Sequence, residues 1–502
     1  MSNSQRAASG ADDEATLAHL GYSQQLKRSL GFLSMFTVSF SVISVTSGIF
    51  TNIAFGYSNF GPASIWTWPV VLAGVLIVSL ILAELGSRIP IAGIGYQWVA
   101  RLTNPGLGWV SAVILFASYT LAIGGVTLFL IAPLIADLFG FDASNTAHMV
   151  LLSVGILIVV AVLNILSVRI TARVNNISLA TELVGTLVLG VTLLIAVLVS
   201  HRAPHTISYL FSTSNPDHNA GLYGFALAAL MSVFTLEGME SAGDLGEEAV
   251  GVRSSVPRAI LGSVLISGIV GMITLICITL AIPDLNKTAS SAAPIAYITS
   301  YWLGGTASKI FLVFIIYSVF AVIVVCVASM ARLIFSMARD NMLPGSTGLM
   351  KVNERTKTPV AAITLVVSAF IIVLFVAAKF PGTYAILIGS TPLLAYLYYL
   401  IIAVSYAIRR RKVSHIPTAF SLGKWAAPVF VVAIVYLVTV IGILTIPSAF
   451  HPSFKTAVIV IGLAVVYYFA WLRRKIKLGQ AGSSLLAKPD LPDPSLTEEG
   501  VG

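Results

Sequence analysis

The sequence predicts an all-α polytopic membrane protein. Hydrophobic residues make up 57% of the 502 residues and charged residues only 10%, against roughly 25% charged in soluble domains. Apolar stretches of about 20 residues, long enough to cross a bilayer as helices, recur along the whole chain. Twelve spans are expected, at residues 30–55, 63–86, 107–136, 149–168, 176–200, 222–246, 257–282, 307–338, 358–378, 382–408, 425–446 and 454–472.

The distribution of positive charge predicts the orientation of these spans. The net charge of +9 is compatible with nucleic acid binding, but Lys and Arg concentrate in alternate loops. Arg88, Arg101 and residues 409–412 are examples, whereas an intervening loop holds the single cation Lys287. Because cytoplasmic loops carry the excess of Lys and Arg, we expect both termini in the cytoplasm and the cell membrane as the location. The partner is then the lipid bilayer and not nucleic acid. Residues 1–28 and 479–502 are expected to be flexible tails.

Membrane enzymes are disfavoured by the placement of reactive residues. Both cysteines, Cys277 and Cys326, lie within apolar runs, which predicts neither a disulfide scaffold nor a metal site. Every histidine falls in a predicted tail, loop or span end, so a general base at membrane depth is lacking. We expect no catalytic residue, metal or cofactor. A channel is the other alternative, and it would be expected to show rings of like residues from several subunits. The oligomeric state stays open.

The sixth span holds the most informative stretch. Glu237 and Glu240 follow an apolar run that starts at Leu222, with Gly238 between them. A charged side chain near the bilayer centre costs about 2.5–3.5 kcal/mol, and two carboxylates three positions apart on a helix would also repel. We therefore predict that the helix breaks at Gly238 and that the freed backbone lines a polar cavity. The alternative is a helix that ends early with Glu237 at the surface, since the run before it has only about 13 residues.

The first span has a matching weak point. Thr46-Ser47-Gly48 makes a poor helix centre, because hydroxyls compete for backbone hydrogen bonds and glycine loses the most entropy. Small residues also allow close helix packing, which is the simpler explanation. However, interrupted helices at corresponding positions of two inverted repeats indicate a transporter site. We expect repeats at about 29–200 and 221–410 and appended spans at about 424–473, within a transporter domain of residues 29–478.

Several motifs resemble a known superfamily. They are GPAS at 61–64, AELGSR at 83–88, EGMESA at 237–242 and MARD at 337–340. Together they resemble the signatures of the amino acid–polyamine–organocation superfamily, and the run FSVISV at 40–45 is similar to its amino acid/choline branch. The resemblance covers roughly residues 25–475. It implies a LeuT-type fold, with spans 1 and 6 broken, and secondary transport of amino acids, polyamines or related amines.

The resemblance also implies a substrate site. Amides of the unwound first span would hold a substrate carboxylate at the positive end of a half-helix, and Phe234 would cover the substrate. Glu237 departs from the family, whose members usually have an aromatic, aliphatic or small residue there, and we expect it or nearby carbonyls to hold an amine. The substrate-binding residues expected are Thr46, Ser47, Gly48, Ile49, Phe234, Glu237 and Gly238. Two substrate classes stay open. A zwitterionic or γ-amino acid needs both the amide cradle and an acceptor, whereas a polyamine or other organic cation needs only acids and aromatic rings.

Four residues are expected in coupling or gating. Glu240 matches an acidic position that members use for proton sensing or for joining the sixth and first spans. Glu182 stands where some members carry a lysine, so it would carry a proton, bind Na⁺ or simply be satisfied by hydroxyls. We favour H⁺ over Na⁺, because the eighth span offers Ser329 but no Ser/Thr pair nearby; an exchanger is the alternative. Glu84 and Arg88 form an i,i+4 pair that would close an inner gate.

Two further clusters are assigned structural roles. Glu247 and Glu248 lie close to Arg253 and Arg258, which predicts a solvated salt-bridge cluster at a cytoplasmic helix end, with gating as the alternative. The Arg339–Asp340 pair is interpreted in the same way. The three tyrosines of the tenth span, Tyr396, Tyr398 and Tyr399, are expected to be packing aromatics.

Overall fold

The computed structural model describes residues 30–166, 168–200, 205–244, 246–291, 293–380, 382–416 and 418–482. The expected N-terminal tail and most of the expected C-terminal tail lie outside the described residues. Within them the regular structure is helical apart from one isolated parallel bridge, between Leu30 and Ala249. The predicted all-α class is confirmed.

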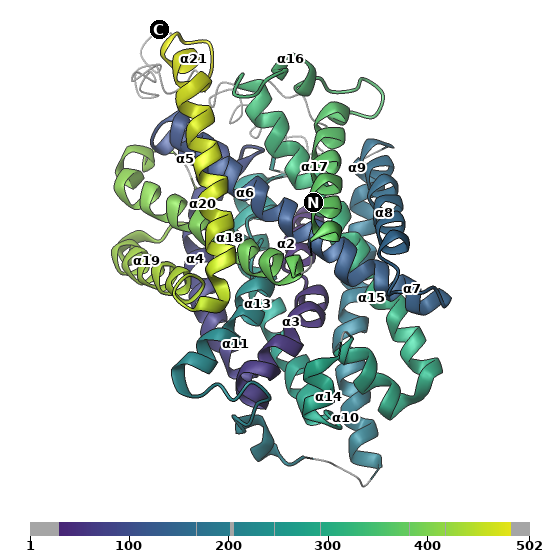
Figure 1. Ribbon diagram of the computed structural model, residues 1–502. Helices are drawn as coiled ribbons and strands as arrows, with labels where there is room; N and C mark the ends of the chain where they lie inside the picture. The colour runs from purple at the N-terminus through teal and green to yellow at the C-terminus, as the bar shows by residue number, and fades with distance from the viewer. Residues whose placement is uncertain are drawn as a thin grey trace.

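Long helices dominate the bundle (Figure 1). The main ones are α2 (Phe32–Ile43), α3 (Val45–Phe60), α4 (Thr67–Arg88), α6 (Pro105–Val126), α8 (Thr146–Leu166), α9 (Val168–Leu183), α10 (Leu189–Val199), α11 (Gly221–Thr235), α13 (Val252–Leu280), α15 (Pro294–Arg339), α17 (Val360–Lys379), α18 (Thr383–Arg409), α19 (Ala426–Ile443) and α20 (His451–Tyr467). Shorter helices include α5 (Ile94–Leu102), α7 (Ala132–Phe139), α12 (Ser241–Asp244), α14 (Leu285–Ser290), α16 (Ser346–Leu349) and α21 (Arg473–Lys477).

Ten helical segments of the described residues are long and apolar enough to cross a membrane. One of them, Phe32–Arg88, is 57 residues long and contains α2, α3 and α4. The helix Gly221–Thr235 is apolar but shorter. The chain is therefore a multi-pass membrane protein.

One predicted boundary is wrong. α8 ends at Leu166 and α9 begins at Val168, so Arg173 lies within a helix and not in the predicted loop. The eighth span begins close to its predicted start at residue 307, because α15 is interrupted at Gly304. The backbone there is non-helical, with φ 78° and ψ 169°, a conformation that glycine adopts without a steric penalty. The residues from Pro294 to this break form a separate helical segment before the span.

The interrupted helices lie inside the bundle, and apolar helices surround them. α2 and α3 pack against α9, α11, α13 and α15, while α8 and α19 lie on opposite sides of the view in Figure 1. Outer helices expose large apolar side chains, such as Leu151 on α8, Val431 on α19 and Leu463 on α20. Such faces are stable against lipid, so the burial pattern agrees with a membrane environment.

Buried ion pairs hold one end of the bundle, which we call the basic end. The Glu84 carboxylate, which is fully buried, lies 2.9 Å from Arg88 and 2.9 Å from Arg410. The expected pairing of Glu84 with Arg88 is present, and Arg410 adds a second partner from the end of α18. The Ser87 hydroxyl donates to the carbonyl of Arg253 at 2.7 Å, which joins the end of α4 to the start of α13.

The prediction for Glu247 and Glu248 is wrong in both partner and exposure. Both carboxylates are buried, and their partners come from α15: Glu247 lies 2.9 Å from Arg339 and Glu248 lies 2.8 Å from Arg332. Arg339 therefore pairs with Glu247, and the neighbouring Asp340 accepts a hydrogen bond from a glutamine of α5. Sequence proximity to cations misled the prediction, because helix packing brings α15 closer to these acids.

Candidate substrate-binding site

The first helix break lies at Ser44, two residues before the predicted weak point. Ser44 has φ 30° and ψ 82°, in the left-handed region, between the end of α2 and the start of α3. Its Oγ accepts a hydrogen bond from the Ser47 amide at 3.2 Å, so the serine caps α3. Thr46 to Ile49 consequently form the first turn of α3, and their assignment to the unwound segment is wrong.

The second break lies at the predicted glycine. α11 ends at Thr235 and α12 begins at Ser241, and between them Gly238 has φ +91°. A side chain would strain this backbone conformation, which explains why glycine stands there. The alternative prediction, a helix that ends early with Glu237 at the surface, is wrong. Glu237 lines an internal cavity, and Glu240 is completely buried.

The two breaks lie against each other. The Ser39 hydroxyl on α2 donates to the carbonyl of Met239 at 2.7 Å. On the other side, a Cβ added to Gly48 of α3 would overlap the side chain of Thr235 at the end of α11. The backbone groups that the two helix breaks leave without helical partners therefore lie close to one another.

A central cavity with about 530 Å³ of atom-free space opens between these breaks. Its described lining contains one acidic side chain, Glu237, and no Lys, Arg or His. The Oε2 atom of Glu237 is buried and has no hydrogen-bond partner in the protein. The cavity lining comprises Val42, Ile43, Ser47, Gly48, Ser118, Tyr119, Ala122, Ile123, Val126, Phe234, Thr235, Glu237, Gly238, Val322, Cys326, Ala395 and Tyr399. Thr46 and Ile49 are not among these residues.

Two tyrosines from other helices hold the second break. The Tyr399 hydroxyl of α18 accepts the Gly238 amide at 2.8 Å and donates to Oε2 of Glu240 at 2.7 Å. Tyr119 of α6 donates to Oε1 of the same carboxylate at 3.2 Å. Glu240 thus joins the break to α6 and α18. The hydrogen bond between the sixth and first spans involves the Met239 carbonyl, which accepts from Ser39, and not the Glu240 carboxylate.

Sequence reasoning missed the role of Tyr399. The sequence predicts a packing role for it, as for Tyr396 and Tyr398, whereas in the structure it contacts both the break and the cavity. Tyr398 is equally buried, but its hydroxyl has no partner. No sequence signal separates the two residues, because they are adjacent and differ only in the direction that the helix gives them.

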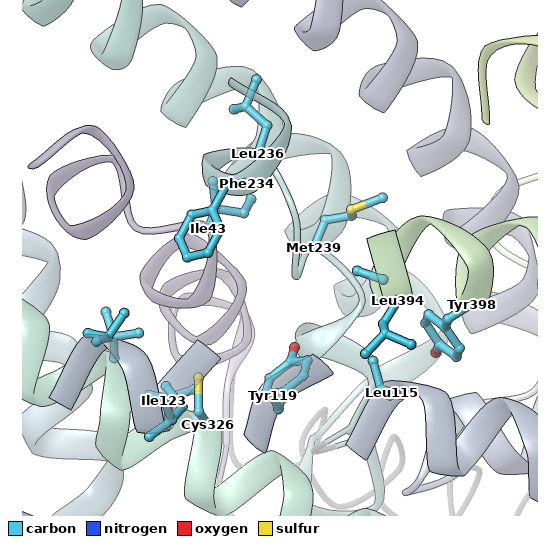
Figure 2. Close-up of a cluster of buried hydrophobic side chains, with 14 of the residues drawn as sticks. Ile43, Leu115, Tyr119, Ile123, Phe234, Leu236, Met239, Cys326, Leu394 and Tyr398 are labelled. Carbon is cyan, nitrogen blue, oxygen red and sulfur yellow. The ribbon is translucent and has the colours of Figure 1, made fainter. Parts of the chain in front are cut away.

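Phe234 borders the central cavity and a second one, as do Ala122 and Val126. The second cavity, with about 230 Å³ of atom-free space, extends toward Thr51 and Tyr384 at the end of the bundle opposite the basic end. The Tyr384 hydroxyl donates to the Thr51 carbonyl at 2.8 Å, which links α18 to α3 there. Figure 2 shows Phe234 beside Ile43, with Tyr119 lower in the same cluster.

Glu182 lies outside the central cavity, at the start of α3. Its Oε1 accepts the Thr46 amide at 3.3 Å, whereas its Oε2 is buried without a partner. The amides of Ser47 and Gly48 bond to the side chain and the carbonyl of Ser44. The positive end of this half-helix therefore already holds a carboxylate of the protein itself, at the place predicted for a substrate carboxylate.

A cavity that holds a buried carboxylate between two interrupted helices, inside a bundle of membrane-length helices, is typical of a membrane transporter. The family model described as amino acid permease matches residues 30–470, and the chain belongs to this family. It is a secondary transporter and not an enzyme.

Curated relatives agree with this assignment. The chain is 28% identical over 492 residues to the amino-acid permease BAT1 of Arabidopsis thaliana, which covers 91% of this chain and 94% of the relative. It is 27% identical over 499 residues to the BAT1 homolog of Oryza sativa subsp. japonica, with 92% and 94% covered. It is also 26% identical over 374 residues to the GABA-specific permease of Saccharomyces cerevisiae, with 71% and 65% covered.

Proposed function

We propose that this permease carries an amino acid or related amine through the central cavity by alternating access. The observation that carries the proposal is Glu237, an acid with an unpartnered oxygen in a cavity whose described lining has no basic residue. A buried carboxylate requires a cation or a proton beside it. The ammonium group of a substrate supplies that cation.

For the substrate class, the geometry favours an amino group held far from any carboxylate. The first-turn amides of Thr46, Ser47 and Gly48 are bonded within the protein, so they leave no free cradle for a carboxylate next to the bound amine. A γ-amino acid fits, and the name of the yeast relative, GABA-specific permease, points in the same direction. The second candidate is a polyamine or other organic cation, which the acidic cavity with Tyr119 and Tyr399 would also accept.

The fold we assign to the transporter is the LeuT type with twelve spans. Counting the segment Phe32–Arg88 as two spans and joining α11 with α12 into one brings the ten candidates to that number. The inverted repeats would cover about 29–200 and 221–410, the appended spans about 424–473 and the domain 29–478. The positive-inside distribution supports a cytoplasmic basic end, both tails in the cytoplasm and a location in the cell membrane.

Two gates would give alternating access. Phe234, which borders both cavities, would be the outer cover of the substrate. Glu240 with its two tyrosines, followed by the Glu84–Arg88 pair, would close the route to the basic end. Two of these contacts join different repeats, the bond from Tyr119 to Glu240 and the ion pair of Glu84 with Arg410, so movement of one repeat against the other would break them.

Glu182 is our proposed coupling residue, and H⁺ is the proposed ion. It is buried at the start of α3, and its Oε2 atom, which has no partner in the protein, can take up a proton. A sodium site would need more oxygen ligands, and α15 contributes Ser329 without a neighbouring hydroxyl. Protonation would weaken the bond to the Thr46 amide and so loosen the first break.

Transport by the purified protein in proteoliposomes tests this proposal. Four labelled probes, γ-aminobutyrate, lysine, alanine and putrescine, are compared with and without inward pH and Na⁺ gradients. We expect saturable uptake of γ-aminobutyrate or putrescine that an inward proton gradient accelerates and a Na⁺ gradient does not. Flux that never saturates would indicate a channel, and Na⁺-driven uptake would overturn the proposed ion.

The variant Glu182→Gln tests the coupling residue. Glutamine keeps the volume and still accepts the Thr46 amide but carries no exchangeable acid proton. We expect uptake that no longer responds to the external pH, with counterflow of the probe retained. A pH profile identical to that of the wild type would remove Glu182 from the mechanism.

A further inference from the structure

One face of α9 carries a continuous row of polar side chains. Thr171, Asn175, Ser178 and Glu182 follow one another at spacings of four, three and four residues, which places them on the same side of the helix. All four are buried, whereas Ile177 on the other side of α9 is 54% exposed. A buried polar row on an otherwise lipid-facing helix needs a reason, since polar groups in a membrane protein interior are expensive.

Three successive residues of this row hold polar atoms without a partner. They are Oδ1 of Asn175, Oγ of Ser178 and Oε2 of Glu182. Each buried unsatisfied polar atom costs about 1–3 kcal/mol, so three in a row would be a large loss for the folded protein. Water is the usual partner of such atoms, and a polar row offers it several hydrogen bonds.

The row begins at a cavity near the basic end. This cavity has about 330 Å³ of atom-free space, and Thr171 and Asn175 line it together with Arg332 of the ion pair described above. Its remaining lining residues are Leu30, Ser34, Val38, Ala172, Val325 and Ala328. The cavity therefore lies where α2, α9 and α15 pack against one another.

The neighbouring helix α2 continues the polar surface. Ser34 and Val38 line the same cavity, and Ser41 follows on the same face of α2 at a spacing of three residues. The Oγ atom of Ser41 is buried and also lacks a partner. Orphan oxygens thus come from both α2 and α9 between the cavity and the level of Glu182.

We propose that this polar face of α9, with Ser41, is a hydrated proton path that joins Glu182 to the basic-end cavity. The path rests on the proposed function of Glu182 as the coupling acid. The proton leaves Oε2 of Glu182 for a water molecule, which passes one of its own protons to the next water or to the Ser178 hydroxyl. Each hydroxyl gives one proton as it accepts another, so the path is unchanged after a transfer. Asn175 is a positioning residue that orients the water.

The charged and titratable groups around α9 leave Glu182 as the acid of the path. α2 and the π-helical turn η3 (Val184–Val188) carry none. On α15, Tyr317 donates to the Val174 carbonyl, Arg332 pairs with Glu248, and Cys326 lines the central cavity. The other ionisable residues of α9 and of the elements packed against it are Tyr57, His148, Arg169, Arg173, Tyr297, Tyr301, Lys309 and Arg339. Among the described residues, the hydrogen bond that the Glu182 carboxylate accepts comes from the Thr46 amide and from none of these groups.

The variant Ser178→Val tests the path, because it fills the row with a methyl group and removes one orphan hydroxyl. Thr181→Val is the matched control, since Thr181 lies on the same helix and, within the part of the chain that the structure describes, its hydroxyl donates to the Ser178 carbonyl. Both variants are reconstituted with entrapped pyranine, which reports internal pH. Gradient-driven uptake is compared with counterflow at equal pH, using the probe that the wild type carries fastest. Counterflow needs no proton release, so it reports folding and substrate binding.

For Ser178→Val we expect wild-type counterflow and a loss of about tenfold or more in gradient-driven uptake and proton entry, as for removal of a proton-transfer group. Thr181→Val should keep both activities. Gradient-driven uptake that survives in Ser178→Val, or an equal fall in both activities, would overturn the path. If Glu182→Gln loses coupling while Ser178→Val keeps it, the path alone is wrong. If Glu182→Gln keeps coupling, the proposed function of Glu182 is wrong.

Discussion

The Tyr399 hydroxyl lies 2.8 Å from the Gly238 amide nitrogen, at the point where α11 has ended and α12 has not begun. The same hydroxyl donates to Glu240, two residues further along. One side chain of α18 therefore satisfies two groups that the helix break has freed. Because the partner is on another helix, a movement of α18 relative to α11 changes the shape of the break and of the cavity beside it.

Replacing this hydroxyl should damage transport. In Tyr399→Phe the Gly238 amide and the Glu240 carboxylate each lose a buried partner, at about 1–3 kcal/mol per group. We expect a lower melting temperature in detergent and slower uptake. Tyr398→Phe is the control, since the Tyr398 hydroxyl is buried without a partner and its removal should be neutral. Equal behaviour of the two variants would contradict the assignment of Tyr399 to the break.

Neutralising the acid of the cavity should change substrate affinity. Glu237→Gln keeps the shape of the side chain and removes its charge, which weakens the bond to an ammonium group by about 1.5–3 kcal/mol, or roughly 10- to 100-fold in KM. The loss should be greater for putrescine than for alanine in the proteoliposome panel. Cys326→Ser, in the same cavity, should leave KM unchanged. Unaltered uptake of every probe by Glu237→Gln would exclude this residue from the site.

The buried pair of Glu248 and Arg332 should be essential for stability. Arg332→Gln leaves the Glu248 carboxylate buried without its cation, which costs about 3–5 kcal/mol. The double variant Glu248→Gln/Arg332→Gln should recover part of this loss in thermal unfolding. An exposed pair provides the control: Lys287→Gln, beside Asp284 at 3.9 Å, should change stability by about 0–1 kcal/mol. Similar effects at both pairs would argue against burial as the cause.

The contact between α3 and α11 should not tolerate a side chain at Gly48. Gly48→Ala places a methyl group against Thr235, so we expect poor folding or loss of transport. Gly462→Ala, on α20, has nothing within 4 Å of the added methyl and should be neutral or slightly stabilising. The comparison requires only membrane expression and uptake of the two variants. Normal transport by Gly48→Ala would mean that the two helices separate more easily than their packing indicates.

The membrane class, the approximate spans and the break at Gly238 follow from the sequence alone. Each depends on the local balance between apolar surface and charge, and that balance is visible in a window of about 20 residues. Two carboxylates within four residues of an apolar run cannot be accommodated in a continuous helix facing lipid, so the break and its cavity were predictable. The pairing of Glu84 with Arg88 is equally local.

Only the tertiary structure decided which side chains meet. Glu247 and Glu248 pair with arginines more than 80 residues away, although Arg253 is close in sequence. The contact of Glu182 with Thr46 and the bond from Gly238 to Tyr399 likewise depend on how separate helices pack. Helix periodicity predicts which residues share a face of one helix. The residues that they contact on a neighbouring helix depend on how the two helices are rotated and shifted against each other. Those quantities are properties of the assembled bundle and of no single segment.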